Sequence, residues 1–248
     1  MKLFNGDCLE IMPTLQSQSV DLIVADLPYG TTQCKWDIVI PFDEMWECIN
    51  RVAKPNAAVV LFGCEPFASH LRLSNLKNYK YDWIWDKVKG TGFLNAKKQP
   101  MRNHELVSVF YKKQPTYNPQ KTTGHKMKKS VRGKHLQTDV YGDMKHDYVY
   151  QSDERYPRSI QVFSSDTQNS SFHPTQKPLA LLEYLIATYS NTGDTVLDFC
   201  MGSGTTGLAA KNIGREFIGI EKEQEYFETA KNRINNDVFN MDLFGGVA

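Results

Sequence analysis

The stretch from Thr195 to Glu221 reads TVLDFCMGSGTTGLAAKNIGREFIGIE and decides the fold. Its first five residues form a short apolar, β-branched run, which is typical of a buried parallel strand. Gly202, Gly204 and Gly207 follow at the spacing of the dinucleotide-binding fingerprint. The pattern therefore predicts a strand that ends in a tight, glycine-rich turn.

A helix and a second strand are expected directly after this turn. Residues 205–213 have a helical pattern, and the apolar run 217–220 ends on Glu221, 23 residues after Asp198. Glycines let a ligand approach the backbone closely, and a carboxylate that closes the next strand can accept hydrogen bonds from ribose hydroxyls. The stretch thus predicts a site for a ligand that contains a nucleoside. The structural alternative is a glycine-rich turn that only packs a helix on a strand.

The bulk composition limits the class of protein. A chain of 248 residues with 41% hydrophobic residues can form one large domain, or a domain with an insertion. It contains no run of 18 apolar residues, and its first residues lack the apolar region of a signal peptide, so we expect neither a membrane span nor secretion. Five scattered cysteines without a CxxC pair predict no disulfide framework, no zinc site and a reducing cytoplasm.

Positive charge is concentrated in one segment. Residues 112–135 carry eight Lys or Arg and no acid, which leaves a net charge of −7 on the rest of a chain whose total is +1. The longer region 112–172 is polar, contains several tyrosines and lacks apolar periodicity, and it is too long for a simple loop in a compact domain. We interpret it as an inserted recognition segment that binds nucleic acid; a merely solvated loop is the alternative.

The remaining pattern alternates strands with helices, which predicts an α/β fold with a doubly wound, mostly parallel sheet. The order is unusual, because the half that binds the nucleoside comes last, as in a circularly permuted chain. The expected strands are residues 20–25, 57–62, 79–85 and 105–111, the expected helices are residues 42–52, 65–75, 179–189 and 223–235, and turns are expected at residues 54–56 and 90–92.

A second motif closes the strand 20–25. Asp26-Leu27-Pro28-Tyr29 follows it at once, and Pro28 ends the strand and favours an extended Leu27. Taken alone, this tetrapeptide could be only a turn.

Together the motifs resemble those of amino-group DNA methyltransferases. Residues 26–29 are similar to the family's DPPY catalytic motif, and residues 198–205 (DFCMGSGT) resemble its S-adenosylmethionine motif. Residues 173–178 (HPTQKP) resemble the segment that precedes that motif in the β class. In the β class the catalytic motif comes first, the target-recognition region second and the cofactor motif last, which is the order in this chain.

The resemblance implies a Rossmann-like S-adenosylmethionine methyltransferase fold. It divides the chain into a catalytic half at residues 1–111, an inserted target-recognition region at 112–172, a cofactor-binding half at 173–236 and a tail at 237–248. Despite this order, the sheet would still be continuous in space.

The resemblance also implies site residues. The cofactor's methionine end would lie near Asp198 and the glycine turn, its ribose on Glu221, its adenine near Asp7, and its carboxylate under Lys177. The implied cofactor-binding residues are Asp7, Asp26, Lys177, Asp198, Phe199, Cys200, Gly202, Ser203, Gly204, Thr205 and Glu221. The implied DNA-binding residues are Lys121, Lys126, Lys128, Lys129, Arg132 and Lys134.

The implied catalytic residues are Asp26, Leu27, Pro28 and Tyr29. The Asp26 carboxylate and the Leu27 carbonyl would each accept a hydrogen of the exocyclic amine, and Tyr29 would stack on the base, which must be flipped out of the duplex. Leu27 replaces the family's usual first proline, but the group used at that position is a backbone carbonyl, which any residue supplies. This chemistry requires no metal.

The resulting hypothesis is a site-specific DNA methyltransferase that acts on the N6 amine of adenine. Asp26 favours adenine over cytosine N4 by family tendency. Cytosine N4, RNA or protein amide remain alternatives within the reaction class; an NAD-dependent oxidoreductase and a non-catalytic DNA-binding module are alternatives outside it. We expect double-stranded DNA as the partner and a bacterial or phage origin, and the sequence leaves open a homodimer and an accompanying restriction enzyme.

Overall fold

The computed structural model of the chain describes residues 1–32, 34, 37–132, 136–138, 142–144, 148–164 and 176–236. The chain forms two compact units, one comprising residues 1–118 and 159–248 and the other Pro119–Arg158. No helix in the described part of the chain is long and apolar enough to cross a membrane.

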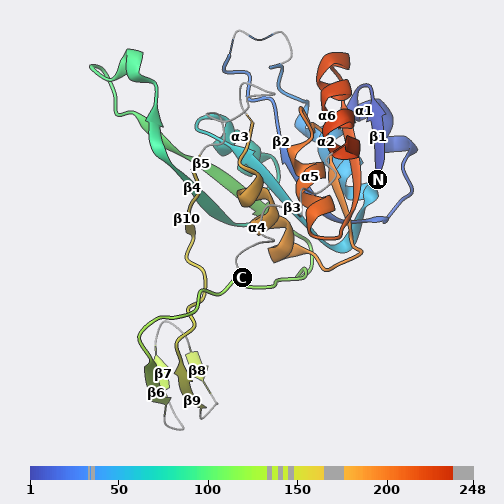
Figure 1. The fold of residues 1–248 in the computed structure, drawn as a ribbon. Coiled ribbons are helices and arrows are strands. Elements are labelled where there is room, and N and C mark those ends of the chain that lie inside the picture. Colours follow the sequence, from blue (N-terminus) through green and yellow to red (C-terminus); the bar gives the residue numbers. More distant parts are fainter. Residues whose placement is uncertain are drawn as a thin grey trace, which may run out of the picture. The chain divides into compact units, whose positions relative to one another are not determined.

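An eight-stranded sheet forms the centre of the larger unit (Figure 1). Its strands pair in parallel except for β5, which runs against both of its neighbours. Long apolar runs form the inner strands, as expected where helices cover both faces of a sheet. In spatial order the strands are β1 (Lys2–Asn5), β12 (Glu216–Glu221), β11 (Thr195–Asp198), β2 (Val20–Asp26), β3 (Ala53–Gly63), β5 (Arg102–Phe110), β4 (Tyr79–Thr91) and β10 (Ile160–Val162).

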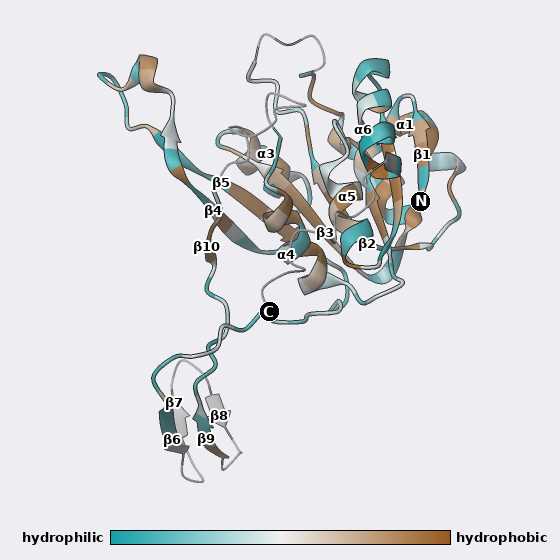
Figure 2. Ribbon diagram, viewed as in Figure 1, coloured by the Kyte–Doolittle hydropathy of each residue, from teal (hydrophilic) through white to brown (hydrophobic). Residues whose placement is uncertain are grey.

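Helices cover both faces of this sheet, and each face has its own buried cluster of apolar side chains. Figure 2 shows the apolar character of the inner strands between the two helical layers. The doubly wound α/β fold predicted from the sequence is thereby confirmed. One face is covered by α4 (Leu179–Tyr189), α5 (Thr205–Asn212) and α6 (Gln224–Asn236), and the other by α1 (Cys8–Ile11), the 3-10 turn η1 (Met12–Thr14), α2 (Phe42–Val52) and α3 (Phe67–Ser74).

The connections change direction between β11 and β2, which lie side by side with Val196 opposite Leu22 and Leu197 opposite Ile23. From β11 the chain passes through α5 to β12 on one side; from β2 it passes through α2 to β3 on the other. Such a switch point opens a crevice outside the carboxyl ends of the two strands, where ligands bind in open α/β sheets. Those ends carry Asp198 and Asp26.

The predicted elements appear, several of them with shifted ends, and three details differ. β1, a short edge strand paired with β12, was not predicted. The turn predicted at residues 54–56 is wrong, because these residues lie in β3 beyond an irregularity in its pairing with β2. The loop predicted from Gly90 lies partly in β4, which continues to Thr91 before the 3-10 turn η2 (Phe93–Asn95).

The smaller unit lies inside the region predicted to be an inserted recognition segment. It contains two antiparallel pairs, of β6 (Lys128–Arg132) with β9 (Tyr148–Ser152) and of β7 (Leu136–Thr138) with β8 (Gly142–Met144). Residues at both ends of the predicted insertion instead belong to the larger unit, where β10 pairs with β4. The predicted tail, residues 237–248, lies outside the described residues.

Gly207 allows α5 to pack closely, and its substitution should destabilise the larger unit. A Cβ atom at Gly207 would lie 2.7 Å from Phe217 Cε1 and 2.5 Å from Ile234 Cδ1. Alanine gains about 0.5–1 kcal/mol in a helix over glycine, whereas overpacking costs about 1–3 kcal/mol, so overpacking dominates. Gly207→Ala should therefore lower the midpoint of thermal unfolding by several degrees.

Circular dichroism during heating measures this effect. Asn232→Ala, on the exposed side of α6, serves as the control and should shift the midpoint little, since surface changes stay within about 0.5 kcal/mol. Equal midpoints for Gly207→Ala and the wild-type protein would show that the helix is not packed as described.

Candidate active site

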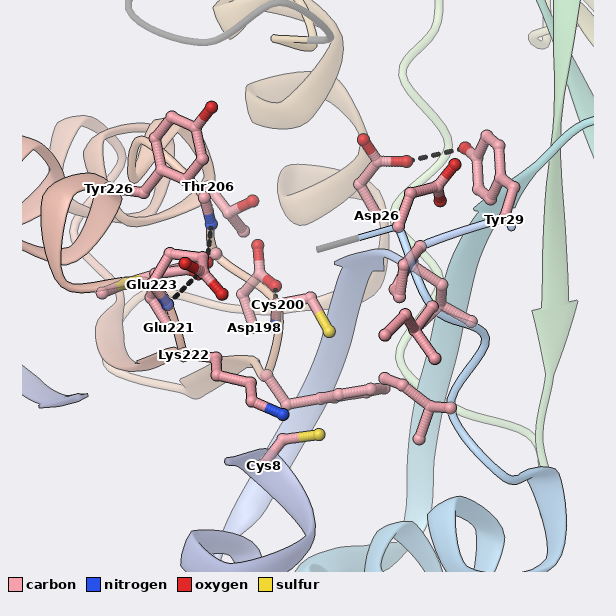
Figure 3. A pocket seen from close by; sticks show the side chains of 18 of the residues that line it. Cys8, Asp26, Tyr29, Asp198, Cys200, Thr206, Glu221, Lys222, Glu223 and Tyr226 are labelled. Atoms are coloured by element: carbon pink, nitrogen blue, oxygen red, sulfur yellow. Dashed lines mark hydrogen bonds between the residues drawn. The ribbon is translucent and has the colours of Figure 1, made fainter. Parts of the chain in front are cut away.

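A cavity of about 340 Å³ lies at the switch point, lined by the ends of β11, β12 and β2 and by the loops that follow them (Figure 3). The cofactor and catalytic residues expected from the sequence come together here, except Gly204, which lies behind the cavity wall. The predicted residues that line the cavity are Asp7, Asp26, Leu27, Pro28, Tyr29, Lys177, Asp198, Phe199, Cys200, Gly202, Ser203, Thr205 and Glu221.

The glycine turn is held from behind by α6. Gly204 has a φ of 81°, and a Cβ atom there would lie 2.8 Å from Ala230 Cβ, so only glycine fits without strain. The Arg233 guanidinium donates to the carbonyl oxygen of Ser203 at 2.6 Å and to the Thr205 hydroxyl at 3.2 Å. These contacts fix the turn before any ligand binds.

Glu221 ends β12 and shapes the rim of the cavity. Its Oε2 accepts a hydrogen bond from the Gly202 backbone N–H at 2.8 Å, and its Oε1 accepts one from the Glu223 N–H at 2.8 Å. Burial raises the pKa of this carboxyl, and the two N–H donors oppose the rise. Each oxygen keeps a further lone pair for a ligand hydroxyl.

Asp198 is buried at the end of β11. Its Oδ1 accepts a hydrogen bond from the Cys200 N–H at 3.0 Å. Burial raises its pKa to about 7, although a hydrogen bond from Thr206 opposes this rise. Asp198 therefore changes its charge near neutral pH, and its ionised form would stabilise a cation in the cavity.

Asp7 lies at the adjoining edge, after β1. As the N-cap of α1 it accepts a hydrogen bond from the Leu9 N–H at 2.9 Å, and its Oδ2 lies 3.0 Å from Lys222 Nζ. Lys222, like Glu223 and Tyr226, lines the cavity without having been predicted; each follows the motif residue Glu221 within five positions.

Asp26 ends β2, and its side chain is 27% exposed. The Tyr29 hydroxyl donates to its Oδ1 at 2.6 Å, and the Lys177 ammonium donates to its Oδ2 at 2.6 Å. Burial raises the pKa of Asp26 and the Lys177 charge opposes this rise. Leu27 is buried beside it.

Tyr29 turns back from the loop so that its ring packs 5.0 Å from the Phe67 ring, measured between centroids. Burial and the neighbouring Asp26 charge raise the pKa of its hydroxyl well above the ordinary value, so the phenol stays protonated. Its predicted stacking on a target base stays a prediction.

Lys177 is buried, and its ammonium binds carboxylates of the protein itself. Besides Asp26, it lies 3.2 Å from Oε2 of Glu105, whose Oε1 lies 2.6 Å from Lys87 Nζ. Burial lowers the pKa of Lys177, but the Asp26 and Glu105 charges outweigh it and raise the pKa overall. A contact with the cofactor's carboxylate, as expected from the sequence, remains a prediction.

Asp37 organises the loop after Tyr29 and was missed in the sequence. Its carboxylate accepts hydrogen bonds from the backbone N–H groups of Gly30, Thr31 and Thr32 at 2.7–2.9 Å. Burial raises the pKa of Asp37, but hydrogen bonds from the Thr32 hydroxyl and from these three N–H groups outweigh it and lower the pKa. An acidic residue a few positions after a Gly-Thr-Thr turn was the available signal.

The predicted DNA-binding residues lie in the smaller unit. Lys126, Lys128 and Lys129 are exposed there, and exposed Lys121 pairs with Glu154 at 2.9 Å. Lys134 and residues 173–175 lie outside the described residues. For Arg132 the structure describes the backbone only. Their role in binding DNA stays a prediction.

Cys200 lines the cavity, but a hydrogen bond with Cys8 and burial raise the pKa of its thiol well above the ordinary value. A thiol in this state is a poor nucleophile. Among the described residues, no group of three or more His, Cys, Asp or Glu side chains could hold a metal ion.

Comparison with known proteins places this geometry in a family. A family model of N6/N4 DNA methylases matches residues 20–232. The type II methyltransferase M.HpaI of Haemophilus parainfluenzae is 30% identical over 97% of this chain and 76% of its own length. M1.MboII of Moraxella bovis is 28% identical over 94% of this chain and 96% of its own length.

Two solved structures of methyltransferases are also similar to this chain. The complex of M1.HpyAVI with S-adenosylmethionine (SAM) is 29% identical and superposes with a TM-score of 0.66 over 94% of this chain and 98% of its own. The PvuII cytosine-N4-specific DNA methyltransferase, at 16% identity, shares the fold with a TM-score of 0.70 over 96% of this chain and 87% of its own.

Proposed function

This chain belongs to the N6/N4 family of SAM-dependent DNA methyltransferases, and we propose that its target within that family is the exocyclic N6 amine of adenine. The observation that carries the proposal is the position of Asp26 at the switch point, in one cavity with Asp198 and Glu221. The family tends to have Asp at this place for adenine and Ser for cytosine N4. Cytosine N4 is the second candidate, since the family contains both.

The cavity fits SAM by the chemistry of its donors. A cavity of about 340 Å³ falls within the usual size of small-molecule sites. Asp7, Asp198 and Glu221 supply carboxylates for a cationic ligand with ribose hydroxyls, and the glycine turn gives access to the backbone. When bound, SAM supplies an electrophilic methyl group on a sulfonium.

Asp26 and Leu27 would make the amine reactive. An exocyclic amine is a poor nucleophile because its lone pair is delocalised into the ring. The Asp26 carboxylate and the Leu27 carbonyl would each accept one amine hydrogen and so favour a more tetrahedral nitrogen. Positive charge then grows on that nitrogen, and a fixed carboxylate stabilises this charge selectively in the transition state.

The base must leave the duplex to reach Asp26, which costs a few kcal/mol. We propose that Tyr29, whose ring is already fixed by Phe67 and Asp26, stacks on the flipped base. Lysines of the predicted recognition region would offset the cost through contacts with phosphates. Double-stranded DNA is the proposed substrate.

A second basic segment supports this substrate. The hairpin of β4 and β5 extends outward from the sheet (Figure 1). Its residues 87–104 carry five Lys or Arg and no acid. At the tip, Phe93 is 77% exposed and Leu94 is 97% exposed. Acidic residues elsewhere outnumber these basic residues, so the net charge of −7 outside residues 112–135 gave no sign of this segment.

The hairpin lysines should strengthen DNA binding through charge alone. Lys97→Ala with Lys98→Ala, both exposed, should weaken binding and reduce the slope of log affinity against log salt by about 1.8, two phosphate contacts at about 0.9 each. Fluorescence anisotropy with labelled duplex measures this slope. The charge-matched control, Lys77→Ala with Lys231→Ala, should leave the slope unchanged, and an equal loss in both pairs would refute the contact.

Asp198 should make SAM binding depend on pH. Because burial raises its pKa to about 7, the free protein carries a neutral Asp198 at lower pH, and ionisation is needed to stabilise the cationic ligand. The dissociation constant should rise by up to about tenfold per unit as pH falls below 7. Calorimetry between pH 5.5 and 7.5 measures it while the ligand's amino group stays charged.

Asp198→Asn is the control for this pH dependence. It should bind SAM weakly at every pH in that range, since its side chain does not titrate. A wild-type affinity that stays constant from pH 7.5 to 5.5, or that increases toward acid, would contradict the assigned role of Asp198.

Analysis of the methylated nucleosides tests the proposed function. Double-stranded DNA is incubated with the protein and SAM, digested to nucleosides and analysed by mass spectrometry. N6-methyladenine is expected, and the Asp26→Asn variant should form it much more slowly than the wild-type protein. N4-methylcytosine alone would refute the proposed base, and DNA without any methylated base would refute the activity.

A further inference from the structure

Four charged side chains form a largely buried chain at the Asp26 end of the cavity. Lys87 Nζ lies 2.6 Å from Glu105 Oε1, and Glu105 Oε2 lies 3.2 Å from Lys177 Nζ. Lys177 Nζ lies 2.6 Å from Asp26 Oδ2. The side chains of Lys87, Glu105 and Lys177 are 12%, 13% and 7% exposed, so water screens these charges weakly.

Both oxygens of the Asp26 carboxylate are engaged within the protein. Tyr29 donates to Oδ1 and Lys177 donates to Oδ2, each at 2.6 Å. A carboxylate that receives a charged hydrogen bond from an ammonium has less negative charge available for a neutral amine. A target amine therefore competes with Lys177 for Asp26 Oδ2.

Glu105 offers Lys177 another partner. Within the part of the chain that the structure describes, no hydrogen bond reaches Glu105 Oε2, although this oxygen is buried. Its separation of 3.2 Å from Lys177 Nζ makes an ion pair without hydrogen-bond geometry. The ion pair with Lys177 offsets part of the cost of burying this oxygen, and a well-directed hydrogen bond from the ammonium would offset more.

We propose that Glu105 is a positioning residue that receives the Lys177 ammonium when the target amine reaches Asp26. The ammonium moves from Asp26 Oδ2 to Glu105 Oε2, and Oδ2 becomes free to accept a hydrogen of the amine. The proton stays on Lys177 throughout, and no covalent bond forms or breaks. This inference rests on the proposed function, because it requires an amine at Asp26.

The charge balance of the cluster permits this movement. A buried ammonium that left Asp26 without a second carboxylate would lose several kcal/mol. Lys87 keeps Glu105 ionised: burial raises the pKa of Glu105, but Lys177 and Lys87 outweigh it and lower the pKa overall. The charged or titratable groups that face Asp26 are Tyr29 from its own loop, Lys177 before α4, Glu105 on β5 and Asp198 on β11.

Glu105→Gln should slow methyl transfer and change its pH dependence together. Lys177 would then have Asp26 as its single carboxylate partner among these groups, so the single-turnover rate at saturating SAM and DNA should fall by about 10- to 10²-fold. The rate also falls at acid pH, where Asp26 is protonated. Because Glu105 raises and Lys177 lowers the pKa of Asp26, this acid limb should move to lower pH in Glu105→Gln.

Lys87→Met provides a second variant with the opposite expectation. Glu105 without Lys87 attracts Lys177 more strongly, so Lys177 protects Asp26 less from protonation and the acid limb should move to higher pH. This variant decides the question if Glu105→Gln does not fold. Glu65→Gln, which breaks a surface ion pair with Arg72, is the matched control and should keep the wild-type rate and profile.

An unchanged rate in Glu105→Gln, or a lower rate with the acid limb at its wild-type pH, would overturn the inference, since a merely structural role predicts the latter. Opposite shifts in the two variants would support it. The wild-type product separates this result from the proposed function: N4-methylcytosine would refute adenine as the target while the comparison of variants remains valid, because either base presents an amine.

Discussion

Asp26→Ala should lower the single-turnover rate of DNA methylation by about 10³-fold or more, the scale expected when a fixed group that stabilises transition-state charge is removed. The variant removes the acceptor that lies beside Leu27 at the end of β2. Lys177 retains Glu105 as a partner, so the local structure should persist. A rapid-quench assay with radiolabelled SAM and duplex DNA measures the rate.

Cofactor binding distinguishes loss of chemistry from loss of structure. The dissociation constant for SAM should stay within about threefold of the wild-type value in Asp26→Ala, because Asp198 and Glu221 lie on other strands. Asp26→Asn keeps the shape and removes the charge, and it should also be slow. A rate near wild type in both variants would show that another group accepts the amine hydrogens.

Glu221→Ala should weaken SAM binding by about 10²-fold. A hydrogen bond from a ligand hydroxyl to a carboxylate contributes about 1.5–3 kcal/mol net of exchange with water, and two bonds at the lower value correspond to about 10²-fold. The substitution also removes the acceptor of the Gly202 and Glu223 N–H groups, so the glycine turn loses an anchor. Isothermal calorimetry measures the change in the dissociation constant.

The kinetics of Glu221→Ala should separate binding from chemistry. At saturating SAM the variant should recover most of the wild-type rate, because Glu221 does not lie against Asp26 in the sheet. Glu225→Gln, exposed on α6 and outside the cavity lining, is the control and should bind SAM like the wild-type protein. An unaltered affinity in Glu221→Ala would exclude a ribose contact at this position.

The sequence sufficed where a local pattern carries the information. The apolar runs of β11 and β12, the glycine spacing between them and the proline after Asp26 predicted the fold and both ends of the cavity. The helices at residues 42–52 and 179–189 begin and end where the pattern places them, because each follows a proline and carries apolar residues at helical spacing.

The parts that depend on tertiary pairing could not be predicted. β1 has four residues and becomes a strand only because β12 offers it an edge. Glu105 follows three other polar residues in β5, so the sequence does not single it out, and its partners Lys87 and Lys177 are 18 and 72 residues away. The lysines of the β4–β5 hairpin were not predicted as a basic segment, because the net charge was summed over all residues outside 112–135, where acidic residues outnumber them.

For Lys177, the motif predicted the position in the cavity but not the groups that its ammonium contacts. The resemblance located it at the cavity, where it lies. Its length and its burial then bring the ammonium to Asp26 and Glu105, two carboxylates contributed by other strands. Which group a buried lysine binds depends on which anions surround it, and a sequence motif does not state that.

A crystal structure with sinefungin, which carries an amine in place of the sulfonium methyl of SAM, tests the central claim most directly. The account predicts ribose hydroxyls on Glu221 and the sinefungin amine within about 3 Å of the Asp26 carboxylate or the Leu27 carbonyl. An adenosine bound against Asp26, or an amine that points away from β2, would contradict it.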